Sequence, residues 1–234
     1  MSIAFTHTST PKSARLASKV WREIKRPFRQ ITTAGSPASS AATTTKPARI
    51  PSLPDLNGRA PTLADFHPQH ATVEPEAIPM IHRLVRESRK YPGPIIEIGT
   101  LLGLTTTTMA LVKAPEQKII TVDLYCWNPW GFTPDVHEAL TSQILHYLVQ
   151  TGHVERIRMD KDEFYRTYQG PAPSMVFLDA MHDYEATKRD IQWASRLGAK
   201  IIAGHDYCEQ FPGVVQIVKE FGGPRKLGGS VWAL

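Results

Sequence analysis

The sequence of 234 residues predicts an α/β fold, a doubly wound and mostly parallel sheet with helices on both faces. Short apolar runs alternate with segments of helical periodicity from residue 74 to the C-terminus, which is the pattern of a parallel sheet covered on both sides. A glycine-containing loop follows the first of these runs, at the position where such a sheet binds its ligands.

The expected elements follow one another closely along this part of the chain. Each helix has apolar residues three or four positions apart, and each strand is a short, mostly apolar run. Helices are expected over residues 76–90, 104–113, 135–151, 183–197 and 213–221. Strands are expected over residues 94–98, 118–123, 154–159, 174–179, 200–203 and 230–234. The segment 222–234 is short for the last two strands of such a sheet. Two alternatives therefore stay undecided: a trimmed edge, or an edge completed by a second copy in a homo-oligomer.

The chain divides into three parts by composition. Residues 1–49 are expected to form a basic, flexible tail and linker, residues 50–73 an extended, proline-rich lead-in, and residues 74–234 the folded domain. The first 50 residues carry nine Lys or Arg and one acid, whereas the remainder carries 18 basic and 21 acidic residues. A tail of this kind either stays solvated or makes weak contact with a membrane surface or a nucleic acid.

Several classes of protein are disfavoured. No apolar run has the length of a transmembrane helix, and the N-terminus lacks the apolar core of a secretory signal, so we expect a soluble, cytoplasmic protein. Cys126 and Cys208 lie far apart without zinc-type spacing, and we expect both to be free thiols.

The sharpest local signal is the segment Glu97-Ile-Gly99-Thr-Leu-Leu-Gly103, at the end of the first strand. Its G-x-x-x-G spacing differs from the G-x-G-x-x-G of dinucleotide sites, so a ligand without phosphates fits better than NAD or FAD. Asp123 closes the second strand, where its carboxylate can accept both hydroxyls of a ribose. Glu97 either anchors the loop or binds the amino group of the ligand. The alternative is that Gly99 and Gly103 serve only turns and packing and that Asp123 merely caps a loop.

A second pair of segments accompanies this loop. Phe177-Leu-Asp179-Ala-Met-His182-Asp-Tyr184 follows the fourth strand, and Gly204-His205-Asp206-Tyr207 follows the fifth. Together with the glycine loop, they resemble class I S-adenosylmethionine-dependent methyltransferases, in particular a subgroup of small bacterial enzymes with D-x-x-H-x-Y and G-H-D-Y motifs. The resemblance covers residues 94–234 and implies a Rossmann-like methyltransferase sheet with S-adenosylmethionine as the cofactor. It places these residues around the cofactor: Glu97, Gly99, Thr100, Gly103, Thr105, Asp123 and Asp160, the last of them near the adenine.

The same resemblance implies the catalytic groups. Asp179, His182 and His205 are candidates for the base that accepts the acceptor's proton, because they follow adjacent strands. Some related methyltransferases hold magnesium with one acid after the fourth strand and an acid pair after the fifth, which corresponds here to Asp179, His205 and Asp206. A histidine in place of a carboxylate favours manganese or another divalent metal over magnesium.

The function that the resemblance implies is O-methylation of a small-molecule or sugar hydroxyl. Two alternatives stay open: a non-catalytic ligand-binding or scaffold protein on the same fold, and a nucleic-acid methyltransferase, which only the basic tail supports. A hydride-transferring dehydrogenase is disfavoured by the glycine spacing.

Overall fold

The computed structural model describes residues 73–234. The predictions made for residues 1–49 and 50–72 lie outside this range. Among the described residues, no helix combines the length and the apolar character that crossing a membrane requires.

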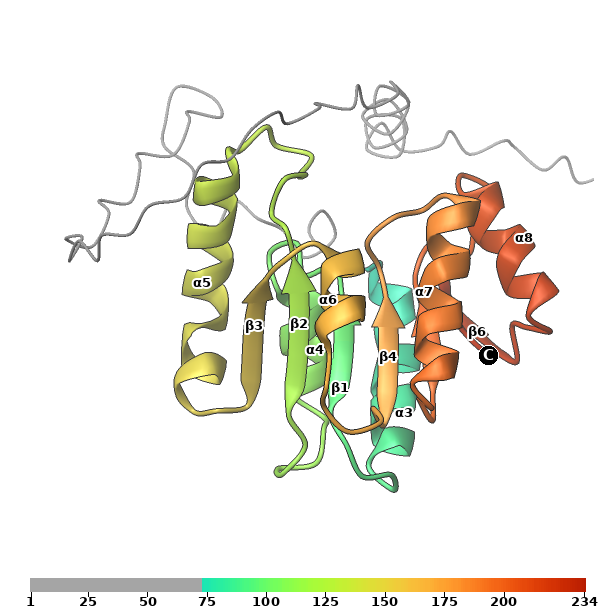
Figure 1. The fold of residues 1–234 in the computed structure, drawn as a ribbon, viewed down its shortest axis with the longest axis horizontal. Helices are drawn as coiled ribbons and strands as arrows, with labels where there is room; N and C mark the ends of the chain where they lie inside the picture. Colours follow the sequence, from blue (N-terminus) through green and yellow to red (C-terminus); the bar gives the residue numbers. More distant parts are fainter. Residues whose placement is uncertain (1–72) are drawn as a thin grey trace, which may run out of the picture. The chain divides into compact units, whose positions relative to one another are not determined.

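The described residues form a seven-stranded sheet with the order β3-β2-β1-β4-β5-β7-β6 (Figure 1). The parallel strands are β1 (Ile95–Ile98), β2 (Ile119–Asp123), β3 (Val154–Arg158), β4 (Met175–Leu178) and β5 (Ile202–Gly204). The antiparallel strands are β7 (Val231–Ala233), which pairs with β5, and β6 (Lys226–Gly228), which pairs with β7. The predicted doubly wound, mostly parallel sheet is therefore confirmed.

Helices cover both faces of this sheet. One face carries α3 (Ile78–Ser88), α4 (Leu104–Ala110) and α5 (Pro134–Gln150), and a 3-10 turn, η2 (Pro75–Ala77), leads into α3. The other face carries α6 (Lys161–Thr167), α7 (Tyr184–Arg196) and α8 (Pro212–Glu220). In Figure 1, α6 and α7 lie in front of the sheet, and α3 and α4 lie behind it. The short helix α6 was not expected from the sequence.

Alternation along the strands divides the core into two layers. In β1, Ile95 belongs to the cluster under α3, α4 and α5, whereas Ile96 and Ile98 belong to the cluster under α6, α7 and α8. In β4, Phe177 belongs to the cluster under α3, α4 and α5, and Val176 belongs to the cluster under α6, α7 and α8. Because successive side chains of a strand point to opposite faces, a strand buried on both sides must be apolar at nearly every position.

The C-terminal end of the sheet differs from the expectation of a trimmed or partner-completed edge. Both final strands are present, each three residues long, and Gly228 pairs with Val231 across a turn of two residues. Gly229 in this turn has φ +60°, which a glycine adopts at little cost. A tight hairpin therefore fits two strands into the short segment. The sequence did not indicate β6, because its residues are polar or small apart from Leu227, which is exposed.

The central strands β1 and β4 approach each other most closely just past their ends. Gly99 follows β1 with φ +96°, and a Cβ on this residue would lie 2.1 Å from the carbonyl oxygen of Asp179, which follows β4. No rotation of a side chain relieves a contact with backbone. Glycine at position 99 is therefore required both by its conformation and by the proximity of the second loop.

We predict that Gly99→Ala destabilises the fold far more than Gly131→Ala. Gly131 also has positive φ (+74°), but nothing lies within 4 Å of the Cβ it would gain, so this control isolates the conformational cost of about 1 kcal/mol. Gly99→Ala must in addition displace the backbone at Asp179 and should cost roughly 2 kcal/mol more. Denaturant unfolding of both variants measures the difference. Equal free energies of unfolding would contradict the close approach.

Candidate active site

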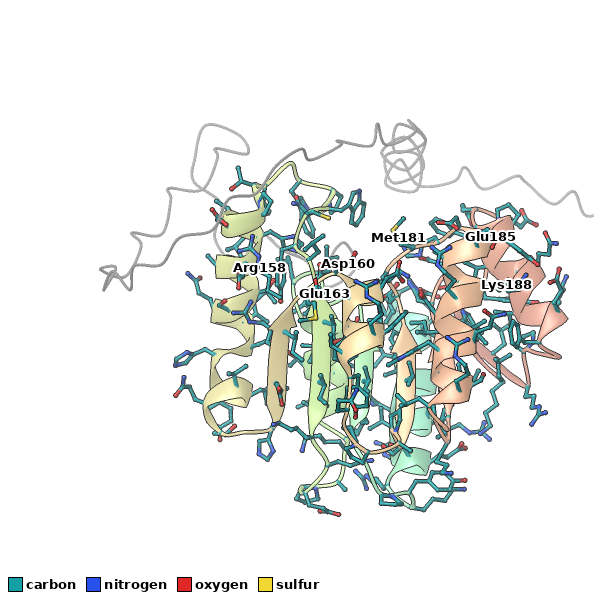
Figure 2. All side chains as sticks on the ribbon, in the orientation of Figure 1. Arg158, Asp160, Glu163, Met181, Glu185 and Lys188 are labelled. Atoms are coloured by element: carbon teal, nitrogen blue, oxygen red, sulfur yellow. The ribbon has the colours of Figure 1, made fainter. Side chains whose placement is uncertain are left out.

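The five parallel strands end at one edge of the sheet, and the loops that follow them carry the predicted site residues. Figure 2 shows Asp160 and Met181 at this edge, toward which the strand arrows point. Three non-glycine residues in these loops have left-handed φ: Leu101 (+47°), Tyr125 (+58°) and Asp206 (+61°). Such backbone costs about 1–3 kcal/mol per residue and persists only where the surroundings enforce it, which is common at functional sites.

Asp123, the last residue of β2, holds the loops after β1 and β2 together. Its Oδ2 accepts the amides of Thr100 (2.8 Å) and Leu101 (2.9 Å), and its Oδ1 accepts the amide of Tyr125 (2.7 Å). A carboxylate offers roughly four acceptor positions, so about one remains free. Asp123 can therefore take one ribose hydroxyl directly, whereas the sequence argument assigned both to it.

Glu97 in β1 is fully buried, with 0% of its surface exposed. Its Oε2 accepts hydrogen bonds from the hydroxyls of Thr106 on α4 and Thr121 on β2, the latter at 2.6 Å, whereas its Oε1 has no partner. Burial raises the pKa of Glu97 to about 8, outweighing the two hydroxyl hydrogen bonds that lower it. Of the two roles considered for Glu97, the geometry favours anchoring the loop over contact with a ligand.

Three other predicted residues of the glycine segment are also buried, whereas Gly99 is half-buried. The hydroxyl of Thr100 lies 2.6 Å from that of Thr121, and Thr105 is buried in the first turn of α4. Gly103 precedes α4 with φ +80°, and an added Cβ would lie 2.7 Å from the side chain of Leu145. The packing explanation therefore applies to Gly103. Cofactor contact by these residues stays a prediction and would have to use their backbone.

Asp160, predicted near the adenine, caps helix α6. Its Oδ1 accepts the amides of Asp162 (2.9 Å) and Glu163 (3.1 Å), which satisfies two backbone donors at the start of the helix. Burial raises the pKa of the Cys126 thiol, and the charges of Asp123 and Asp160 raise it further, so both acids lie near this cysteine. Asp160 is exposed at the edge where Asp123 ends β2, and a capping role does not prevent it from contacting a ligand.

The predicted catalytic and metal residues come together after β4 and β5. Nδ1 of His205 lies 3.4 Å from Oδ1 of Asp179 and 3.3 Å from Oδ1 of Asp206. Nδ1 of His182 lies 2.7 Å from the other carboxylate oxygen of Asp206. The four side chains form one cluster, as the pairing of adjacent strands β4 and β5 requires.

A fifth member of this cluster, Glu74, was missed in the sequence. Its Oε2 lies 2.9 Å from Nε2 of His205, and its carboxylate also accepts the amide and the hydroxyl of Ser230 in the β6–β7 turn. Burial opposes ionisation, but the hydrogen bonds from His205 and Ser230 prevail and lower the pKa of Glu74 to about 2. Glu74 lies 131 residues from His205 in the chain and belongs to no motif, so no local signal identified it.

These contacts determine the protonation of the cluster. Burial lowers the pKa of His205, but Asp179, Glu74 and Asp206 outweigh it and raise the value well above the ordinary one. The pKa of His182 is also raised, because Asp206 outweighs the effect of burial. Both nitrogens of His205 face carboxylates, which favours a protonated ring that cannot accept a further proton. Burial raises the pKa of Asp179, which makes this carboxylate the better base.

Three of these groups meet the requirements of a divalent metal site. Ligand atoms of Asp179, His205 and Asp206 all lie within 4.8 Å of one another. Glu74 accepts a hydrogen bond from the opposite nitrogen of His205, which is the arrangement that orients and strengthens a metal-bound histidine. Two carboxylates and one imidazole suit manganese, iron or zinc, and magnesium less well.

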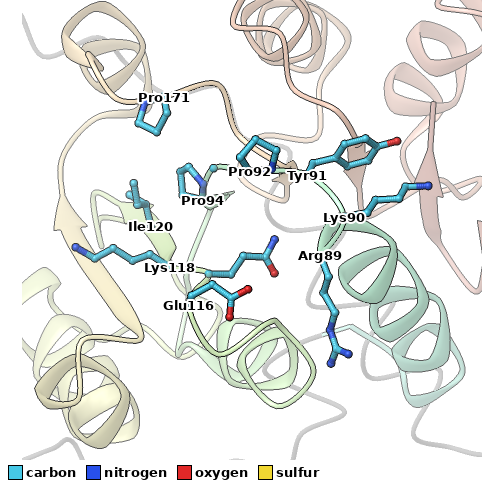
Figure 3. A pocket seen from close by; sticks show the side chains of 11 residues that line it. Arg89, Lys90, Tyr91, Pro92, Pro94, Glu116, Lys118, Ile120 and Pro171 are labelled. Carbon is cyan, nitrogen blue, oxygen red and sulfur yellow. The ribbon is translucent and has the colours of Figure 1, made fainter.

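A depression of about 450 Å³ lies at the opposite edge of the sheet, where the strands begin (Figure 3). It is lined by residues of the segments that precede β1, β2 and β4, among them Arg89, Tyr91, Pro94, Lys118 and Pro171. None of the predicted site residues lines it. In doubly wound folds, ligands bind at the carboxyl ends of the strands, so the loops described above are the stronger candidate.

Part of the chain is similar to a known protein family. Residues 96–207, from β1 to just past β5, match a protein family described as a methyltransferase domain. This part of the chain is therefore similar to a methyltransferase domain. The matched residues include the glycine segment, Asp123 and the cluster after β4 and β5, but not Glu74. No curated protein matches the sequence.

Solved structures share the fold of this chain at low sequence identity. The cofactor-bound protein Rv0187 from MTB has a TM-score of 0.52 and 20% identity, over 70% of this chain and 81% of its own. An O-methyltransferase from Bacillus cereus in complex with SAH has a TM-score of 0.51 and 17% identity, over 70% and 80% of the two chains. The O-methyltransferase TomG from Streptomyces achromogenes, in complex with SAM, has a TM-score of 0.51 and 18% identity, over 70% and 79%. The Rossmann-like methyltransferase fold is thereby established.

We predict that Glu97→Gln removes a pH dependence of stability. The pKa of Glu97 rises from 4.5 to about 8 on folding, so the folded protein binds this proton more tightly and its free energy of unfolding falls as the pH rises from about 4.5 to about 8. Between pH 6 and 9 the free energy of unfolding of the wild type should fall by on the order of 3 kcal/mol more than that of the variant, whose amide does not ionise. Urea unfolding at both pH values measures this difference.

Glu116→Gln, a change of the same kind at an exposed position, is the control for this measurement. The free energy of unfolding of this control should change with pH as that of the wild type does. A Glu97→Gln variant that loses as much stability as the wild type over the same pH range would show that Glu97 does not titrate there.

Proposed function

We propose that the methyltransferase domain transfers a methyl group from S-adenosylmethionine to a hydroxyl group of a small molecule or sugar. The observation that carries the proposal is the meeting of two sets of groups at one edge of the sheet. The glycine loop anchored on Asp123 lies on one side, and the cluster around Asp179 and His205 on the other. The contact between Gly99 and the Asp179 carbonyl joins them. Two neighbours of the same fold are O-methyltransferases in complex with SAH or SAM, which supports this cofactor and reaction.

The cofactor is expected beside the loop after β1 and the end of β2. Asp123 retains about one acceptor position for a ribose hydroxyl, and Asp160 lies at the same edge, where it can face the adenine. Gly99 allows the loop after β4 to pass directly beside the loop after β1, since the Asp179 carbonyl occupies the place of a Cβ. The buried side of this loop is formed by Glu97, Thr100, Gly103 and Thr105.

The transfer itself makes modest demands on the protein. The acceptor oxygen attacks the methyl carbon, the new O–C bond forms as the C–S bond breaks, and the sulfonium becomes the neutral thioether of S-adenosylhomocysteine. The proton of the acceptor hydroxyl must then be taken up by a base. We assign this role to Asp179, because both nitrogens of His205 already face carboxylates and Nδ1 of His182 faces Asp206. The protein's remaining task is to position the two substrates.

The cluster is also suited to a divalent metal. Asp179, His205 and Asp206 would hold it, and the metal would supply polarisation of the acceptor hydroxyl, which eases loss of the proton. Glu74 positions His205 for that role through the hydrogen bond to Nε2. Without a metal, His205 bridges the same carboxylates as a cation and compensates their charge.

The cofactor assignment predicts that Asp123→Ala weakens binding of S-adenosylhomocysteine at least about tenfold, because both a ribose contact and the anchor of the loop are lost. Calorimetric titration measures the dissociation constant. Asp135→Ala is the control, since Asp135 is an exposed acid whose Oδ1 lies 3.3 Å from Arg158. An unchanged affinity in Asp123→Ala would contradict the assignment. Absence of binding by the wild type in any condition would favour a scaffold role.

The metal assignment predicts that the wild type binds Mn²⁺ and that Asp206→Asn weakens this binding at least about tenfold. The signal of free Mn²⁺ in electron paramagnetic resonance reports binding without a methyl acceptor. Asp183→Asn is the matched control, because Asp183 only caps α7 and Asn caps helices equally well. If both variants bind Mn²⁺ like the wild type, the cluster is not a metal site, and Asp179 acts without one.

A further inference from the structure

His137 is a buried side chain that neither the sequence motifs nor the proposed chemistry uses. It lies in the first turn of α5 and has 0% of its surface exposed. Its Nε2 lies 3.0 Å from the carbonyl oxygen of Leu101, and its Nδ1 lies 3.3 Å from the carbonyl oxygen of Tyr125. These carbonyls belong to the loops after β1 and β2, so one ring contacts both loops.

The same two residues are held from their other side by Asp123. The amides of Leu101 and Tyr125 donate to the Asp123 carboxylate, while their carbonyls face the ring of His137. Both residues have left-handed φ, +47° and +58°, which is unfavourable for side chains larger than glycine. Conformations of this kind persist only when several contacts enforce them, and here an acid and an imidazole contact each residue from opposite ends, at its amide and at its carbonyl.

We infer that His137 is a positioning residue that, opposite Asp123, fixes the two loops between which the cofactor binds. This inference rests on the proposed cofactor site. Thr141, one turn further along α5, supports it, because its hydroxyl donates to the same Leu101 carbonyl at 2.6 Å. Helix α5 thereby reaches the cofactor loops through two buried polar side chains.

The chemistry of the ring distinguishes its two contacts. Burial lowers the pKa of His137, although Asp123 and the two carbonyls oppose this, so the ring is neutral near pH 7 and carries one N–H. The shorter contact assigns that proton to Nε2, which donates to Leu101. The loop after β2 is held instead by packing, since the rings of His137 and Tyr125 meet edge to face at 5.2 Å and 88°.

The test compares two substitutions of His137. His137→Phe keeps a ring against Tyr125 but loses the hydrogen bond to Leu101, and we expect it to weaken binding of S-adenosylhomocysteine about tenfold in calorimetry. His137→Gln supplies an amide donor near the position of Nε2 and should bind within about threefold of the wild type. His146→Phe, an exposed position on the same helix, is the control and should leave affinity unchanged. Circular dichroism verifies that each variant is folded. If His137→Phe does not fold, Thr141→Val takes its place, because it removes only the hydroxyl that donates to the Leu101 carbonyl.

Two further readouts separate positioning from bulk stability. Nitrogen-15 shifts of labelled wild-type protein should show His137 as the Nε2–H tautomer. Amide exchange at Leu101 and Tyr125 should accelerate in His137→Phe and not in His146→Phe. If the wild type binds S-adenosylhomocysteine and His137→Phe binds it equally well, the inference is overturned. If the wild type does not bind, the proposed cofactor site fails, and unchanged amide exchange in His137→Phe would then refute the loop contact itself.

Discussion

The arrangement of the site depends on the carboxylate of Asp123. Three backbone amides from two loops donate to it, and two of them belong to residues with left-handed φ. Without this acceptor, the three amides would lose their shared partner at the edge of the sheet, and the contacts of His137 and Thr141 alone would have to hold Leu101 and Tyr125. An acid at the end of β2 is thus a structural requirement of the loop conformation as well as a candidate ligand contact. The two functions need not compete, because a carboxylate accepts more than three donors.

A second constraint joins the beginning and the end of the described residues to the edge of the sheet that carries the cluster. Glu74 precedes η2, Ser230 lies in the last hairpin, and His205 follows β5, yet the three are connected through one carboxylate. The hairpin of β6 and β7 therefore does more than complete the sheet. Ser230 in its turn donates hydrogen bonds to Glu74, and Glu74 in turn orients His205. This explains why the short C-terminal segment must form both strands. A sheet edge left open or supplied by another chain would not present Ser230 to Glu74.

The sequence was sufficient for what depends on local pattern. Periodicity identified the parallel strands and five of the helices, and strand adjacency placed Asp179, His182, His205 and Asp206 in one cluster, as observed. It was not sufficient where a residue acts through distant backbone. Glu74 and His137 belong to no motif, and their partners lie 131 and 36 residues away in the chain. Helix α6 was missed for a different reason, because only one of its seven residues, Phe164, is buried, which leaves little apolar periodicity to detect.

Two glutamates show how the fold assigns different roles to the same side chain. Glu74 accepts hydrogen bonds from a histidine, a hydroxyl and an amide, and its pKa falls to about 2, whereas Glu97 accepts only two hydroxyls in a fully buried position and its pKa rises to about 8. Near neutral pH the first is a charge that stabilises a protonated histidine, and the second holds its proton. A charged Glu97 would repel Asp179 and Asp123 from within the sheet. A neutral Glu97 leaves the negative charge at the edge, where a cationic sulfonium or a divalent metal would gain from it.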